Sequence, residues 1–191
     1  MEEFTEQEKI ARSKKMMLWF GIVSLIMGFA GWTSAYIVSS SREDWLNDFK
    51  LPTEFYFSAL VLFISSISYI MAKRSVKEDR AQQATLYLAA TFLLGILFVT
   101  LQISGFYSFI DLGYYFTGPT SNVTISFIYI IALMHIVHLL AGFISLGVVI
   151  VNQVKGRYDA EHMLGLELGA TFWHFLDLLW IYLVLFFHFF N

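Results

Sequence analysis

Five long apolar stretches set the limits on any fold that this chain can adopt. They cover residues 16–40, 55–72, 84–106, 125–151 and 168–190, and charged segments separate most of them. A bilayer core of about 30 Å needs about 20 apolar residues to be crossed as a helix. Because lipid cannot hydrogen-bond a bare backbone, each stretch is predicted to be a transmembrane helix. The sequence therefore predicts an all-α, polytopic integral membrane protein.

The composition and length agree with a single membrane-embedded unit. The chain of 191 residues is 58% hydrophobic and only 14% charged, whereas a soluble domain carries about 25% charged residues. We expect a cytoplasmic N-terminal tail at residues 1–15 and one five-helix domain at 16–191. The first apolar stretch is too long for a signal peptide and lacks a small-residue cleavage site, so we expect it to remain in the mature protein.

Basic residues are distributed unevenly between the two predicted sides of the membrane. One side carries only Arg42 and Lys50. The other side carries Lys9, Arg12, Lys14, Lys15, Lys73, Arg74, Lys77, Arg80, Lys155 and Arg157. Because Lys and Arg concentrate in cytoplasmic loops, we predict a cytoplasmic N-terminus and a C-terminus outside.

The last two apolar stretches contain ionisable side chains, which cost about 2.5–3.5 kcal/mol each in a membrane and so need partners. At helical spacing, Glu167, His174 and Asp177 form one stripe, and His135 and His138 share a face. We predict that these five residues form a structural polar clasp between the two helices. Within it, Asp177 is expected to pair with a histidine of the preceding helix.

Other chemistries fit these residues less well. The chain has no cysteine, which excludes disulfides, thiolate metal sites and cysteine nucleophiles. His135 and His138 compete for one side of a helix, and an HExxH zinc pair would need i, i+4 spacing and a glutamate. Ser104-Gly105 lacks the motif of a serine hydrolase. We therefore predict no catalytic, metal or cofactor site, and we keep a small transporter or a haem-binding membrane cytochrome as the alternative class.

The first apolar stretch carries a stripe of small residues, which allow close approach between helices. We predict a packing face within the chain, with a face for another subunit as the alternative. The stripe consists of Gly21, Ser24, Gly28, Gly31 and Ala35.

Three motifs give the chain a family resemblance. They are Leu93-Leu-Gly-Ile-Leu-Phe-Val-Thr-Leu-Gln102, His135-Ile-Val-His-Leu-Leu-Ala-Gly142 and Glu167-Leu-Gly-Ala-Thr-Phe-Trp173-His-Phe-Leu-Asp-Leu-Leu-Trp180. In this order and spacing they resemble cytochrome c oxidase subunit III, a subunit of the haem–copper terminal oxidases, in its five-helix bacterial form. The chain departs from the family pattern at Leu25 and Gly105, where a glutamate is usual. A proton-collecting role that depends on those carboxylates is therefore in question.

The resemblance implies a non-catalytic subunit of a cytochrome c oxidase, an O2-reducing and proton-translocating oxidoreductase complex in a bacterial cytoplasmic membrane. Its expected partners are subunit I directly, subunit II and other oxidase subunits, and structural phospholipid, with haem and copper in the partner subunits. Its helices are expected to form two bundles, the first two and the last three, around a V-shaped cleft that holds lipid. It is expected to stabilise subunit I and to support proton uptake.

Several questions stay open at the level of sequence. A quinol oxidase subunit III and a nitric oxide reductase accessory protein would carry the same three motifs, so both stay open as alternatives. The motifs also do not indicate whether the complex belongs to a respiratory supercomplex. The small net charge of −3 gives no indication of a nucleic-acid partner. The basic cluster after the second stretch is interpreted first as a plain topology signal, with lipid head-group contacts as the alternative. This cluster consists of Lys73, Arg74, Lys77 and Arg80.

Overall fold

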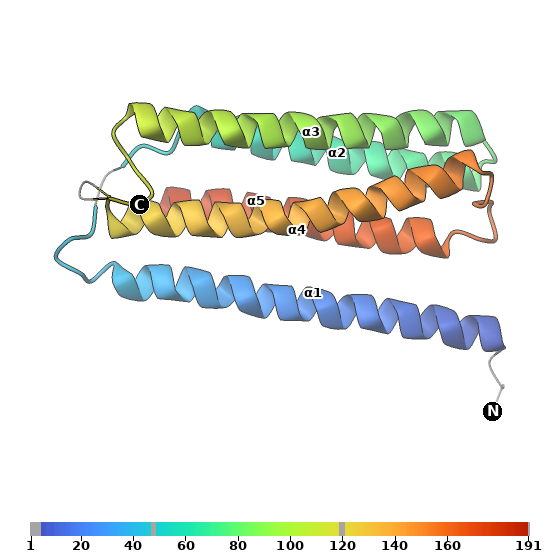
Figure 1. The fold of residues 1–191 in the computed structure, drawn as a ribbon. Helices are drawn as coiled ribbons and strands as arrows, with labels where there is room; N and C mark the ends of the chain where they lie inside the picture. Colours follow the sequence, from blue (N-terminus) through green and yellow to red (C-terminus); the bar gives the residue numbers. More distant parts are fainter. Residues whose placement is uncertain (1–4, 47–48, 119–120, 191) are drawn as a thin grey trace.

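A computed structural model of the chain describes residues 5–46, 49–118 and 121–190. This part of the chain folds into five long helices that lie side by side and alternate in direction (Figure 1). The helices are α1 (Glu6–Ser39), α2 (Thr53–Lys77), α3 (Ala81–Asp111), α4 (Val123–Val154) and α5 (Leu164–Phe189). All five are long and apolar enough to cross a membrane, which confirms the all-α, five-span prediction.

The helices extend beyond the apolar stretches, because their ends are set by capping groups and turns. At the start of α1 the Thr5 side chain accepts from the backbone N–H of Glu8, and the Glu8 carboxylate accepts from the Thr5 N–H at 2.8 Å. This reciprocal arrangement is a capping box. The expected tail is therefore helical from residue 6 onward, whereas residues 1–4 lie outside the described residues.

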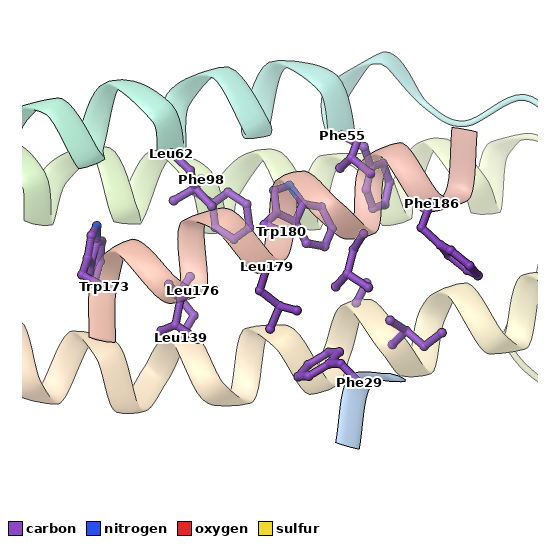
Figure 2. Packing of buried hydrophobic residues seen from close by; sticks show 14 of the residues in the cluster. Phe29, Phe55, Leu62, Phe98, Leu139, Trp173, Leu176, Leu179, Trp180 and Phe186 are labelled. Carbon is purple, nitrogen blue, oxygen red and sulfur yellow. The ribbon is translucent and has the colours of Figure 1, made fainter. Parts of the chain in front are cut away.

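One helix, α5, lies at the centre of the fold. It packs on α1, α2 and α4, and 56% of its most apolar window is buried, against 17% for α1. Figure 2 shows α5 between α2 and α4, with Trp173, Leu176 and Trp180 pointing into the packed interior. The helix that carries the densest motif is thus also the helix that the others surround.

The expected division into helices one and two against helices three to five is wrong. In the described residues α2 packs on α3 and α5, whereas α1 packs on α4 and α5 and makes no backbone approach to α2. Figure 1 shows α1 along one edge of a bundle formed by the other four helices. The polar side chains that join α2 to α3 and α5, described below, explain why α2 belongs to this bundle.

The small residues of α1 do not form a packing face within the chain. A Cβ atom added at Gly21, Gly28 or Gly31 would meet nothing within 4 Å, and Ser24 and Ala35 are also exposed. The intrachain prediction for this stripe is therefore wrong. The alternative, a face for another subunit, stays a prediction.

Candidate functional site

Serines of α2 receive the polar side chains of the family motifs. Ser58 Oγ accepts from Trp180 Nε1 at 3.0 Å and from Gln102 Nε2 at 2.7 Å, and Ser65 Oγ accepts from Trp173 Nε1 at 3.0 Å. The two serines and the two tryptophans are each seven residues apart, or about 10 Å along a helix. Because α2 and α5 are antiparallel, this equal spacing brings each of the two indoles level with one of the two serines.

These serines were not predicted, although the sequence contains a signal for them. Ser58 and Ser65 lie in a largely apolar stretch and have the same seven-residue spacing as the motif tryptophans. A buried indole N–H needs an acceptor, so the matched spacing could have predicted that α2 packs against α5.

A third serine of α2 joins two ionisable groups of α5. The Ser66 hydroxyl lies 2.9 Å from Nδ1 of His174 and hydrogen-bonds Oδ2 of Asp177. Asp177 is 2% exposed, and its other oxygen, Oδ1, has no hydrogen-bond partner among the described residues. The predicted pairing of Asp177 with a histidine of α4 is therefore wrong. The polar stripe of α5 faces α2 at this level, so its partner comes from α2.

The two histidines of α4 contact different neighbours. His135 is fully buried, with its ring centroid 5.0 Å from that of Trp180 and 5.9 Å from that of Phe98. Neither of its ring nitrogens has a hydrogen-bond partner among the described residues. His138 donates from Nδ1 to the Met134 carbonyl oxygen at 2.7 Å, and its ring meets Phe29 of α1 edge-on. Both histidines thus pack against aromatic rings and do not pair with Asp177.

The fifth predicted clasp residue, Glu167, lies at the opposite end of the stripe. Its carboxylate is 3.1 Å from Lys15 Nζ of α1 and 3.8 Å from Lys73 Nζ of α2. These three side chains border a pocket of about 190 Å³ that Trp19 and Thr171 also line. The carboxylate thus joins three helices at the end of the bundle where the basic residues gather. The five predicted residues are distributed over several places and do not form a single clasp.

The other members of the basic cluster lie at the end of α2 and in the turn to α3. Arg74 and Lys77 are in the last turn of α2, and Arg80 forms an ion pair with Glu78 at 3.2 Å. Their contact with lipid head groups stays a prediction. Across residues 5–46, 49–118 and 121–190, no three His, Asp or Glu side chains gather as metal ligands would.

Two motif glycines allow close helix packing. A Cβ at Gly95 would lie 2.8 Å from the ring of Phe143, and one at Gly142 would lie 2.8 Å from Leu176 Cδ1. The departure at Gly105 has a similar steric basis, because a Cβ there would lie 2.7 Å from the ring of Phe55. A glutamate at this position would require the Phe55 ring to move.

Comparison with known proteins agrees with this arrangement of motifs. The family model described as cytochrome c oxidase subunit III matches residues 32–191. Cytochrome c oxidase subunit 3 of Cyprinus carpio is 32% identical over 141 residues, which is 72% of this chain and 49% of the carp protein. Subunit 3 of the cytochrome bo(3) ubiquinol oxidase of Pseudomonas aeruginosa is 31% identical over 133 residues, or 70% of this chain and 62% of that protein.

The corresponding subunit of Buchnera aphidicola is 33% identical over 138 residues, which is 69% of this chain and 66% of its own length. The chain thus spans about half the length of the first relatives and more of the ubiquinol oxidase subunits. The matched region includes α2 to α5 with all three motifs. The chain belongs to the cytochrome c oxidase subunit III family.

Proposed function

We propose that this chain is the non-catalytic subunit III of a proton-pumping haem–copper cytochrome c oxidase in an aerobic respiratory chain. A non-catalytic role is supported by the hydrogen bonds that the motif side chains make within the chain. Gln102, Trp173 and Trp180 all donate hydrogen bonds to serines of α2 within the same chain. Side chains engaged in this way hold helices together, and the haem and copper centres belong to the partner subunits.

The proposed subunit stabilises subunit I, assembles with subunit II and other oxidase subunits, and binds structural phospholipid. The outward small-residue stripe of α1 supports contact with another transmembrane helix, because such residues let backbones approach. An apolar groove of about 270 Å³ between α1 and α5, lined by Phe29, Ala30, Phe175 and Leu178 among others, supports contact with acyl chains. The lysines beside Glu167 support contact with head groups and a role in proton uptake at that end.

We place the chain in a bacterial cytoplasmic membrane, with the N-terminus in the cytoplasm and the C-terminus outside. The ion pairs of Glu167 with Lys15 and Lys73 support this orientation, since they join basic segments at one end of the bundle. Basic residues concentrate on the cytoplasmic side of membrane proteins.

A quinol oxidase is the second candidate for the complex. Subunits of ubiquinol oxidases and of cytochrome c oxidases match this chain at 31–33% identity alike. A nitric oxide reductase accessory protein remains a further alternative in the same family. A small transporter or a haem-binding membrane cytochrome is the alternative from another class.

The test is purification of the tagged full-length chain from its native membranes, with mass identification of every partner and assay of cytochrome c and quinol oxidation. Co-purification of subunit I, a copper-binding subunit II and cytochrome c oxidase activity is the expected result. Quinol oxidation without a copper-binding subunit II would support the second candidate. Recovery of the chain without any oxidase subunit, with an untagged strain as the control, would overturn the proposal.

A further inference from the structure

The Ser66 hydroxyl lies between two groups that can each hold a proton. A serine hydroxyl has one proton to donate and two lone pairs that accept. It can therefore donate to only one of His174 Nδ1 and Asp177 Oδ2, and both contacts are hydrogen bonds only if the other group donates to it. When the pair of His174 and Asp177 carries no net charge, the same positions of the heavy atoms fit two arrangements of protons.

In the first arrangement, His174 is an imidazolium that donates from Nδ1 to Ser66, and Ser66 donates to the Asp177 carboxylate. In the second, Asp177 is a carboxylic acid that donates from Oδ2 to Ser66, and Ser66 donates to Nδ1 of a neutral imidazole. The conversion breaks the Nδ1–H and Oγ–H bonds and forms new Oγ–H and Oδ2–H bonds. One proton is transferred in effect, and no electron is gained or lost.

We propose that Ser66, His174 and Asp177 form a proton-binding site inside the membrane, in which one proton is shared between the carboxyl and imidazole groups across the serine hydroxyl. The inference does not rest on the assignment to a particular oxidase. It concerns contacts within this chain alone.

The surroundings of Asp177 favour the neutral arrangement. Asp177 is 2% exposed, and its Oδ1 has no hydrogen-bond partner among the described residues. An ionised carboxylate with a bare oxygen is costly in apolar surroundings, whereas a neutral acid costs much less. The site therefore holds its proton mainly on Asp177, and His174 is neutral.

Of the three side chains, Asp177 is buried, whereas Ser66 and His174 are only partly buried. Within the site, the two hydrogen bonds allow a proton to pass between the His174 ring and the carboxyl through Ser66. On the same stripe of α5, Glu167 lies seven residues before His174, which is about 10 Å along the helix. It lines the pocket that Lys15 and Lys73 border.

Charged and titratable groups near the site come from four elements. On α2, the Tyr69 ring centroid lies 5.8 Å from that of His174, and Lys73, four residues after Tyr69, borders the pocket beside Glu167. On α5 and α1, Glu167 and Lys15 form their ion pair toward the end of the bundle. On α4, His135 packs on Trp180, which is three residues beyond Asp177, and His138 packs on Phe29 of α1. The remaining helix, α3, carries its one charged side chain, Asp111, in its last turn.

The test combines infrared spectroscopy and nitrogen NMR on the full-length chain in lipid vesicles across a pH titration. At neutral pH we expect a carbonyl stretch from a protonated carboxylic acid that Asp177→Asn removes and that Glu167→Gln, the matched control, leaves unchanged. The His174 ring signal and this band should change together, because the protons of a coupled pair belong to both groups. Ser66→Ala should separate the two titrations by about one pH unit or more, and Ser66→Thr should restore their coupling.

Two results would overturn the proposal. The first is the absence of any carboxylic-acid band that depends on Asp177. The second is an identical pair of titrations in the wild type and in Ser66→Ala. Circular dichroism verifies that each variant retains its helices. If Ser66→Ala misfolds, His174→Gln tests the same coupling, because loss of the imidazole must then change the titration of the carboxyl band.

Discussion

The Ser58→Ala substitution tests the contact between α2 and α5 most sharply. It removes one oxygen that accepts from two buried donors, Trp180 Nε1 and Gln102 Nε2. Buried side-chain hydrogen bonds in membrane proteins contribute about 0.6 kcal/mol on average and at most about 1.7 kcal/mol each. Two bonds therefore give an expected loss of about 1 kcal/mol in the free energy of unfolding, with an upper limit of about 3 kcal/mol.

Reversible unfolding in mixed micelles, followed by far-ultraviolet circular dichroism, measures this loss. Ser65→Ala removes the acceptor of a single indole and a long hydrogen bond of 3.5 Å to the Thr91 carbonyl oxygen, so it should cost less than Ser58→Ala. Thr100→Val is the matched control, because that exposed hydroxyl bonds only within its own helix, and its effect should stay within about 0.5 kcal/mol. In a double-mutant cycle, Ser58→Ala and Trp180→Phe should be non-additive. Full additivity, or a Ser58→Ala variant as stable as the wild type, would refute the reasoning.

Four further substitutions test other parts of the fold. Gly95→Ala should cost about 1–3 kcal/mol of unfolding free energy by overpacking, since its Cβ would meet Phe143. Gly28→Ala should leave the unfolding free energy of the isolated chain unchanged, because a Cβ there would meet nothing within 4 Å. Equal losses for Gly28→Ala and Gly95→Ala in mixed-micelle unfolding would contradict this packing. Glu167→Gln should weaken the contact between α1 and α5 by at most about 1 kcal/mol, because the ion pairs that it removes are partly exposed. Disulfide trapping between cysteines placed on α1 and α5 measures this change, and a loss that does not fall with added salt would argue against ion pairing. Hydrogen bonds from the His162 ring and from backbone N–H groups lower the pKa of Asp159, in the loop before α5. Their stabilisation is present above the ordinary pKa of an aspartate and is lost as the pH falls through the lowered value. Asp159→Asn should therefore flatten the acid side of a pH–stability profile, and an unchanged profile would count against this contact.

The number and type of helices could be predicted because apolar length is nearly sufficient in a membrane. The arrangement of the helices could not. In lipid, each helix is apolar on most of its surface, so hydropathy does not say which face meets a neighbour. The division into two bundles failed for this reason. The information was instead in a few polar positions, since Ser58 and Ser65 of α2 match the spacing of Trp180 and Trp173 on α5.

The sequence indicated the polar stripe of α5, but it did not indicate the serines of α2 that the stripe and the motif tryptophans contact. The stripe of Glu167, His174 and Asp177 was evident from helical spacing, yet spacing within α5 does not reveal which helix the stripe faces. The prediction paired Asp177 with a histidine of α4, whereas the hydroxyl that meets Asp177 comes from α2. The outward stripe of α1 shows the same limit, because small residues serve contacts within a chain and between chains equally well.

We propose above all that the imidazole, carboxyl and indole groups of α4 and α5 hold helices together and bind no haem. The absorption spectrum of the isolated full-length chain in detergent, with its helix content verified, tests this claim most directly. We predict no Soret band from the isolated chain and a strong band from the intact complex. A stoichiometric Soret band in the isolated chain that His135→Ala or His174→Ala abolishes would contradict it.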